Sequence, residues 1–219
     1  SEGSINQAAI RGLSAQFITK GDETSAQVRA AQSDLQGITS GHGNVAGVEV
    51  KNAQFSNASG ISAQADSLSV NNIDTDMADA ERLNLSKIAV NHQNGNTEAS
   101  VGQIVANGID TEPVDVSQVN LNDVSLNHSQ NGLTSQISAA KGNGVEIDGA
   151  ASIDAFSAKN MQGNVSNDSQ TGSFEQINLG GIQANQDNFS VGSVNLTDGT
   201  VQNNSTGTTA NLGAANFQD

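Results

Sequence analysis

The stretch from Val114 to Leu126, VDVSQVNLNDVSL, shows most clearly how apolar residues are spaced in this chain. Two apolar residues lie two positions apart and the next pair begins three positions later, so one five-residue motif occurs three times in succession. The mean step of about 2.5 residues is far from the helical period, and Asn, Gly and β-branched residues disfavour helices. The pattern therefore predicts β-strands.

The five-residue spacing also predicts that these strands are bent. Side chains alternate between the two faces of a flat strand, so the next apolar pair would fall on the opposite face. The apolar residues stay on one face only if the chain turns a corner or bulges at each intervening pair of polar residues. Turn-tolerant residues occupy these pairs: Lys51-Asn52, Ser86-Lys87, Asn122-Asp123, Lys159-Asn160 and Thr197-Asp198.

The same motif recurs in six units that cover almost the whole chain. At one end of each unit a glycine recurs between two similar segments, and this arrangement predicts a hairpin turn there. These glycines are Gly21, Gly60, Gly95, Gly132, Gly172 and Gly207. A second set of turns is expected halfway through the units, at Gly41-His42, Asp76-Met77, Glu112-Pro113, Asp148-Gly149 and Gln186-Asp187. The single proline, Pro113, suits a turn because it cannot donate to a strand ladder.

Two all-β architectures satisfy this pattern. The first is a stack of about six antiparallel hairpins, which gives about twelve bent strands in one curled, elongated sheet about 55 Å long. The second is a β-solenoid with the glycine turns as protruding loops. In both, residues 1–219 form a single repetitive β domain. Because the chain begins SEGSINQ and repeats from end to end, we expect it to be a fragment of a longer protein.

The pentads VNLND and LNLSK resemble the pentapeptide-repeat family, whose unit has the same inward-facing pair. The resemblance covers the pentad runs and implies a solenoid. The chain departs from the family where Val70, Thr75, Ala80 and Ala106 replace the central Leu or Phe. Regular hairpin turns are also foreign to the family, and they favour stacked hairpins.

Composition narrows the class of protein. The 219 residues include 8 Lys and Arg against 23 Asp and Glu, which gives a net charge of −15, and no Trp, Tyr or Cys. Disulfides, zinc–thiolate sites and thiol nucleophiles are thereby excluded. The acidic balance argues against a nucleic acid partner. Near-absence of proline and strict apolar spacing favour an ordered repeat over disorder.

The residues that could form a metal or catalytic site are explained more simply as solvent-exposed polar residues. His92 and His128 occupy equivalent positions in two units, and we expect exposed turn histidines there and not a metal pair. Oxygen ligands can hold Ca²⁺, but the known calcium-loop spacing is missing, which favours a solvated acidic face. The acidic residues in question are Asp74, Asp76, Asp79, Glu81, Asp110, Glu112 and Asp115. No phosphate loop, nucleophile elbow or HExxH motif occurs, so we expect no catalytic residue, cofactor or metal site.

Repetition without a singular site predicts a non-enzymatic repeat segment of a secreted or surface-exposed bacterial protein. It would act as a rigid spacer or interaction scaffold for a protein partner or for neighbouring domains of the same chain. One alternative is a lipid-binding hydrophobic groove, resembling the bent sheets of AsmA- or TamB-like envelope proteins. An open groove of large apolar residues would favour lipid binding, and a closed interior would favour the scaffold. Another alternative is an acidic pentapeptide-repeat-like mimic of DNA. Membrane association and oligomeric state stay open.

Overall fold

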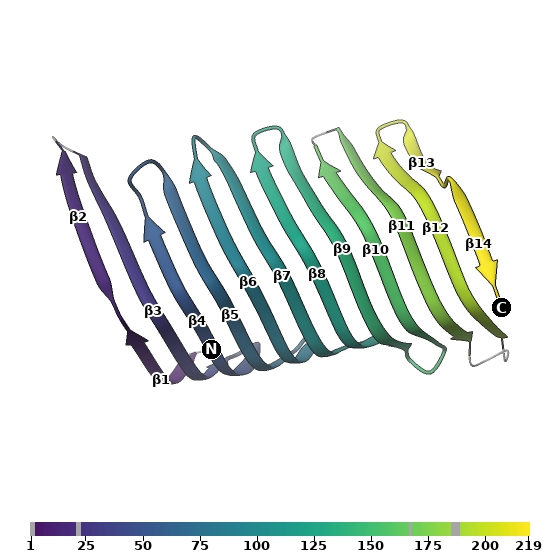
Figure 1. Ribbon diagram of the computed structural model, residues 1–219, viewed down its shortest axis with the longest axis horizontal. Helices are drawn as coiled ribbons and strands as arrows, with labels where there is room; N and C mark the ends of the chain where they lie inside the picture. The colour runs from purple at the N-terminus through teal and green to yellow at the C-terminus, as the bar shows by residue number, and fades with distance from the viewer. Residues whose placement is uncertain (1–2, 21–22, 167, 185–188) are drawn as a thin grey trace.

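The computed structural model describes residues 3–20, 23–166, 168–184 and 189–219, and in these it contains strands and turns but no helix. Fourteen antiparallel strands form one sheet (Figure 1). The prediction of an all-β repeat fold is confirmed. In chain order, the strands are β1 (Ser4–Arg11), β2 (Ser14–Lys20), β3 (Glu23–Ser40), β4 (Gly43–Ser56), β5 (Ile61–Thr75), β6 (Asp79–Gln93), β7 (Asn96–Thr111), β8 (Val114–Ser129), β9 (Gly132–Ile147), β10 (Ala151–Val165), β11 (Ser169–Ala184), β12 (Phe189–Asn204), β13 (Gly207–Asn211) and β14 (Ala214–Gln218).

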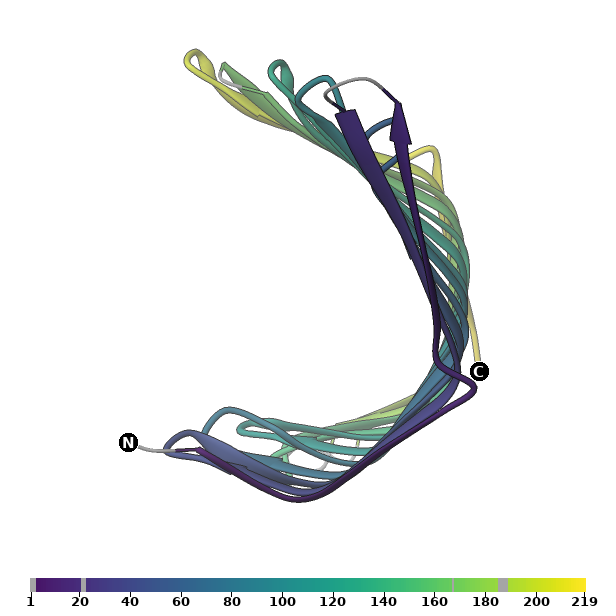
Figure 2. The ribbon, with the colours of Figure 1, turned by 90° about the vertical axis from the view of Figure 1, so that its left-hand side faces the viewer.

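Each strand from β3 to β12 pairs with its neighbours in the chain. At one edge β1 and β2 both pair with β3, and at the other edge β13 and β14 both pair with β12. Each edge pair thus occupies a single strand position, and the sheet has twelve positions. Antiparallel pairing of successive strands decides for stacked hairpins and against the solenoid. Viewed along its long axis, the sheet curls into a trough that is open on one side (Figure 2).

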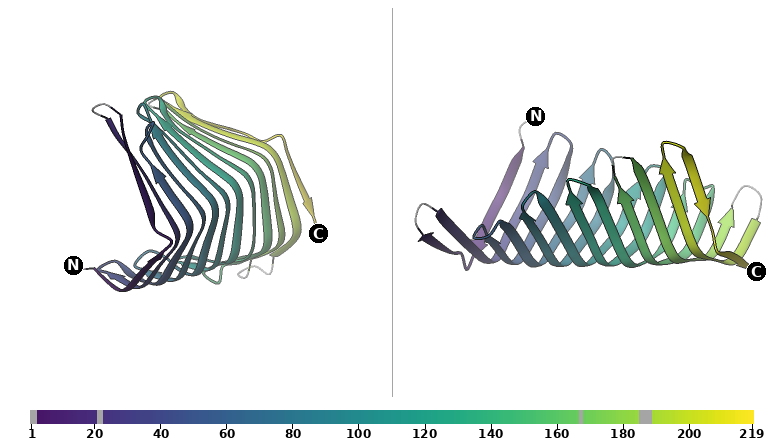
Figure 3. Two further views of the ribbon diagram at one scale, coloured as in Figure 1. Left: turned by 60° about the vertical axis from the view of Figure 1, so that its left-hand side comes forward. Right: turned by 90° about the horizontal axis from the view of Figure 1, so that it is seen from above.

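The predicted corners are present in every strand where they were expected. In each of the five polar pairs, the second residue has a left-handed backbone with φ between 48° and 54°, and its side chain is exposed. The five are Asn52, Lys87, Asp123, Asn160 and Asp198. Asn and Asp adopt this conformation most easily among residues with a side chain. These corners lie on every second strand, β4, β6, β8, β10 and β12, and form one line across the sheet, which bends as a whole (Figure 3).

A second line of corners was missed in the sequence. It lies on the alternate strands, where Gly37, Asn72, Gly108, Gly144 and Gly181 have φ between 47° and 61°. Each is followed by Ile or Val, so a glycine or asparagine before a β-branched residue is a repeat signal in its own right. At Gly144 a Cβ would collide with the Ser117 side chain of the neighbouring strand. Glycine is required there for space as well as for its backbone conformation.

The turns agree with the prediction at all described positions except one. Glycine turns occur at Gly60, Gly95, Gly132 and Gly207, and the second set is present at 41–42, 76–77, 112–113 and 148–149. Gly21 and Gln186-Asp187 lie outside the described residues.

The turn predicted at Gly172 is wrong. Gly172 lies inside β11, paired with Gly163 and Val201. The chain reverses earlier, where the Ser166 backbone N–H donates to the Ser169 carbonyl at 2.8 Å and the Ser166 hydroxyl contacts Ser169. Serine side chains can close a turn in this way without glycine.

Met77 is a poor turn residue, and the structure shows how its turn is closed. The Thr75 hydroxyl donates to the Ala78 carbonyl at 2.6 Å and accepts from the Ala78 N–H at 3.1 Å. The Asp79 carboxylate accepts from the Thr75 N–H. Met77 itself is 89% exposed, so flanking residues and not Met77 determine the turn.

Candidate functional site

The register of the sheet gathers the apolar residues into straight rows that cross the strands. One row contains Leu121 together with Leu85 and Leu196. In full it runs Ile10, Ser33, Val50, Leu68, Leu85, Ile104, Leu121, Ala140, Ala158, Ile177, Leu196 and Ala215. Parallel rows pass through Val116, Val119, Val124 and Leu126. We call these five rows the apolar face.

The apolar face carries no charged side chain in any of its described rows. Its least exposed members, Ala140, Ala158 and Val194, are 4 to 8% exposed and lie between the two lines of corners. Nearer the glycine turns the rows open to solvent, and Phe55 and Leu126 are 40% and 43% exposed. Corner side chains point away from this face because a bend has room for two successive residues only on its outer side. The apolar face therefore lines the inside of the bend.

Nothing in the described chain covers the apolar face. No large side chain among the described residues is fully buried, because the sheet is a single layer. Monomeric soluble proteins rarely leave contiguous apolar surface of this extent exposed, and where they do, the surface is often a binding site. A closed interior, one of the two possibilities left open by the sequence, is absent from the described residues.

Aromatic rings fill gaps in the apolar face where glycine leaves no side chain. The Phe156 ring lies over Gly142 of the neighbouring strand, and the Phe174 ring lies over Gly199. Phe55 and Phe156 also lie in rows of the apolar face, and Phe189 is 57% exposed at the start of β12. These pairs keep the surface continuous from strand to strand.

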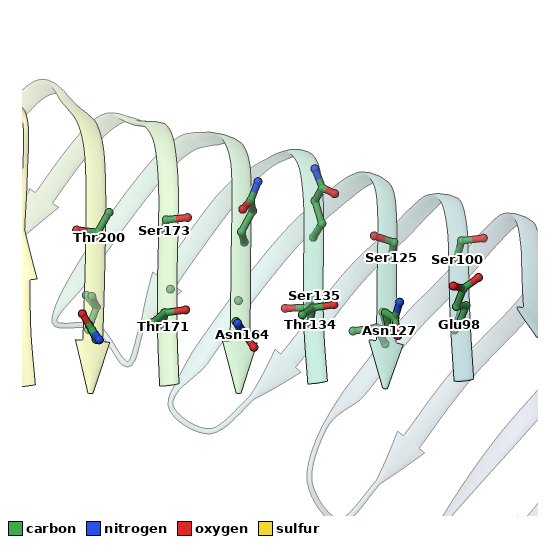
Figure 4. Close-up of a pocket in the computed structure, with 18 of the residues that line it drawn as sticks. Glu98, Ser100, Ser125, Asn127, Thr134, Ser135, Asn164, Thr171, Ser173 and Thr200 are labelled. Atoms are coloured by element: carbon green, nitrogen blue, oxygen red, sulfur yellow. The ribbon is translucent and has the colours of Figure 1, made fainter. Parts of the chain in front are cut away.

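The opposite face is polar and contains a shallow hollow of about 750 Å³ (Figure 4). Two polar rows line it, one through Ser125 and one through Asn127, and residues of the row through Leu126 lie between them in the lining. Hydroxyl and amide groups predominate, and Glu98 is the charged residue in its lining. Members drawn in Figure 4 include Ser100, Thr134, Asn164, Thr171, Ser173 and Thr200.

The hollow offers hydroxyl and amide groups for hydrogen bonds, with the Glu98 carboxylate as the ionisable group of its described lining. His128 follows Asn127 in the strand, so its side chain belongs to the other face of the sheet.

The two candidate histidines lie in one row, with Thr97 between them. His92 Nδ1 lies 2.8 Å from the Thr97 hydroxyl, and both histidines are exposed. This agrees with the prediction of exposed histidines near the turns. The two histidines lie two strands apart, and among the described residues they are not part of a group of three or more possible metal ligands.

Acidic residues from five consecutive strands form a row on the polar face, which we call the acidic ladder. It contains Asp74, Asp79, Asp110, Asp115 and Glu146, all exposed. Loss of hydration and then repulsion from Asp110 raise the pKa of Asp115, with smaller contributions from Glu146 and Asp148. The sequence pointed to the first four residues in separate clusters, but only the register joins them and adds Glu146.

The remaining acidic candidates are not members of the ladder row. Glu81 packs over Gly108 and lines the same hollow as the ladder, Glu112 lies in a turn, and Asp76 Oδ2 is 3.7 Å from His42 Nδ1. The described residues contain no group of three or more His, Asp or Glu side chains arranged to hold a metal ion.

Comparison with known proteins gives no relative for this chain: no family model, curated protein or solved structure matches it. A helix long and apolar enough to cross a membrane does not occur among the described residues. The geometry of the sheet is therefore the feature that bears on the function of this chain.

Proposed function

We propose that this chain is a section of an open trough that binds the acyl chains of lipids along its apolar face. The observation that carries the proposal is the uncovered apolar face itself, which is continuous across twelve strand positions. Covering apolar surface contributes about 25 cal/mol per Å², so an occupant of this face gains substantial binding free energy.

Lipid acyl chains suit this surface better than most alternatives for two reasons. The rows run along the long axis of the sheet for about 55 Å, and an extended hydrocarbon chain can lie along them. The rows also lack the charged side chains that fix the register of a protein partner. The predicted bent sheet resembles those of AsmA- and TamB-like envelope proteins, as noted above, and this resemblance supports the proposal.

A fluorescent fatty-acid titration tests the proposal. Leu126→Asp places a charge on an exposed part of the apolar face, and we expect at least a tenfold loss of probe affinity. Ser125→Asp adds the same charge one residue away on the polar face, opposite the uncharged Ser100 and Gln136, and its affinity should match that of the original chain. Equal losses in both variants, or no probe binding by the folded original chain, would contradict lipid binding.

A rigid spacer or scaffold is the second candidate function. Support for it comes from the uniform repetition of hairpins and the lack of a singular polar site in the described residues. In that case a protein layer would cover the apolar face. Leu126→Asp would then weaken capture of that layer while the fatty-acid probe showed no saturable binding to either protein.

A further inference from the structure

One border of the apolar face is formed by a row that contains both candidate histidines. His92 and His128 are the next-to-last residues of β6 and β8, whose arrowheads lie at the top of Figure 1. Two residues before each of them, Val90 and Leu126 belong to the apolar face. Because residues two apart in a strand point to the same side, both imidazole rings share the side of the sheet that carries the apolar face. We call their row the border row.

His92 and His128 are the only ionisable side chains on this side of the sheet, among the described residues of the border row and of the apolar face. Strands β5 and β9 place Ile61 and Leu133 beside them in the border row. The Glu98 carboxylate of β7 belongs to the polar face, where it lines the hollow of Figure 4. Neither histidine therefore faces a carboxylate in its own row. Since histidine gains a positive charge between about pH 8 and pH 5, that charge is open to a bound anion.

Thr97 of β7 lies between the two histidines, and its hydroxyl oxygen is 2.8 Å from His92 Nδ1. If the hydroxyl donates to Nδ1, the ring proton of His92 is on Nε2, and if Nδ1–H donates to the hydroxyl oxygen, the hydroxyl proton is free. When the ring is protonated, both nitrogens carry a proton. In every state this pair keeps one N–H or O–H to donate to a ligand. The His128 ring has no hydrogen-bond partner among the described residues and supplies a further donor.

Donors gathered in one row suit an oxyanion, which accepts hydrogen bonds and carries a negative charge. Adjacent strands are about 4.8 Å apart, so the three polar side chains of the border row are spread over about 10 Å. Carboxylate and phosphate oxygens form the stronger, charge-assisted hydrogen bonds with protonated histidine. The border row therefore favours an anionic group over a neutral hydroxyl or ester.

The apolar face begins directly beside these donors. Residues two apart in a strand are about 7 Å apart, so the first methylene groups behind a bound oxyanion reach Val90 and Leu126. These two side chains are 37% and 43% exposed. Their row continues along the sheet to Phe55, which is 40% exposed. A hydrocarbon chain can thus leave the donors and lie on apolar surface without crossing a polar row.

The opposite border of the apolar face repels anions. There the row through Val116 lies beside the acidic ladder, with Asp115 immediately before Val116 and Asp110 immediately after Ile109. Like charges repel across a sheet that is a single layer thick, so an anionic head group is disfavoured at this border. The two borders therefore give a bound anionic lipid one orientation.

We propose that His92, Thr97 and His128 bind the carboxylate or phosphate head group of an acyl ligand whose hydrocarbon chain lies on the apolar face. This inference rests on the proposed lipid binding and adds the class of ligand, an anionic lipid, and the border at which its head group binds. Neutral lipids of the same chain length bind more weakly because they offer no charged acceptor to the border row.

Displacement of a neutral apolar naphthylamine dye by dodecanoate and by dodecanol tests the proposal, since the two ligands share a hydrocarbon chain and differ in the head group. We expect the original chain to bind dodecanoate roughly tenfold more tightly than dodecanol. The double variant His92→Leu/His128→Leu should bind both ligands equally and retain its affinity for dodecanol. His42→Leu is the matched control, because His42 lies in a turn outside the border row and its side chain is 91% exposed.

Histidine ring resonances in NMR spectra locate the head group. Besides His92 and His128 the chain contains only His42, so the leucine variants assign each signal. Dodecanoate should shift the resonances of His92 and His128 and leave those of His42 unchanged. Acetate and inorganic phosphate at the same concentration should shift them far less, because no hydrocarbon chain holds these anions at the border row. Equal shifts with acetate or phosphate would assign the border row to free anions and overturn the head-group proposal.

The outcomes separate this inference from the lipid binding on which it rests. Dye displacement by neither ligand would refute both. Equal affinity of the original chain for dodecanoate and dodecanol would leave lipid binding standing and refute the head-group site. A double variant that still prefers dodecanoate would refute that site as well. Both histidines are exposed, so the double variant should fold, which circular dichroism checks.

Discussion

At the scale of single residues, the corners explain how one apolar pattern stays on one face. Asp123 turns the backbone between Leu121 and Val124, so both flanking side chains reach the apolar face. Asparagine and aspartate fit because their side chains tolerate φ near +50°. Some also stabilise the corner across strands: the Asn52 amide donates to the Asp66 carboxylate at 2.7 Å.

Substitutions at Leu121 and Asn122 should show which face of the sheet each side chain occupies. Leu121 lies between Ile104 and Ala140 and is half-buried, so we expect Leu121→Asp to lower the free energy of unfolding by about 2 to 3 kcal/mol. Asn122 accepts from the Gln103 amide at 3.4 Å on the other face, and a carboxylate would still accept. Asn122→Asp should therefore cost less than about 0.5 kcal/mol. Urea denaturation measures both, and equal effects would mean that the faces are assigned wrongly.

At the scale of elements, cross-strand pairs decide local stability, and the acidic ladder is the unfavourable case. Asp110 lies directly opposite both Asp79 and Asp115. Like charges facing each other across strands destabilise the pairing. The raised pKa of Asp115 is consistent with this repulsion, which adds to its partial loss of hydration.

The ladder gives a pH dependence of stability with a definite sign. A carboxyl group whose pKa is higher in the folded state disfavours folding once it ionises. The penalty is absent below the unfolded pKa of about 3.9 and develops as pH rises through the raised folded value. We expect Asp110→Asn to stabilise the fold at pH 7 and to have little effect at pH 3, as measured by urea midpoints.

A matched variant outside the ladder provides the control. Asp66 accepts the hydrogen bond from Asn52, and an asparagine oxygen would accept it without the charge, so Asp66→Asn should slightly destabilise the fold at pH 7. Stabilisation by Asp66→Asn, or an Asp110→Asn effect that does not depend on pH, would argue against the ladder as its cause.

At the scale of the whole molecule, the free energy of unfolding should be close to a sum of the interactions between neighbouring strands. Contacts join each strand only to the next, as in other repeat proteins. Deleting residues 97–132 removes β7 and β8 together and rejoins equivalent positions, since Thr97 and Leu133 belong to the same row. The shortened chain should fold, with a denaturant m-value smaller by about a sixth, because m follows the surface exposed on unfolding.

Deletion of one strand is the informative contrast. Removing residues 96–111 takes out β7 alone and leaves the end of β6 at the opposite side of the sheet from the start of β8. The remaining turn cannot span that distance, so we expect loss of the cooperative transition in circular dichroism. Cooperative folding of this variant would contradict the hairpin register.

The sequence alone determined the strands, the first line of corners and most of the turns. Five-residue spacing excludes a helix, and a polar pair inside each period forces a corner, as at Asn122-Asp123. These are local consequences of how side chains alternate along a strand. The turn at Gly172 was predicted wrongly because serine hydroxyls at Ser166 and Ser169 close the turn elsewhere, and local composition does not distinguish the two.

Only the tertiary structure decided what depends on register. Whether the hairpins form an open sheet or a solenoid is determined by which strands pair, and pairing joins residues far apart in the chain. The same holds for the acidic ladder, which unites Asp74 and Glu146 across five strands, and for the uncovered apolar face. The physical reason is that periodicity determines which way each side chain points, whereas its neighbours follow from long-range pairing between strands.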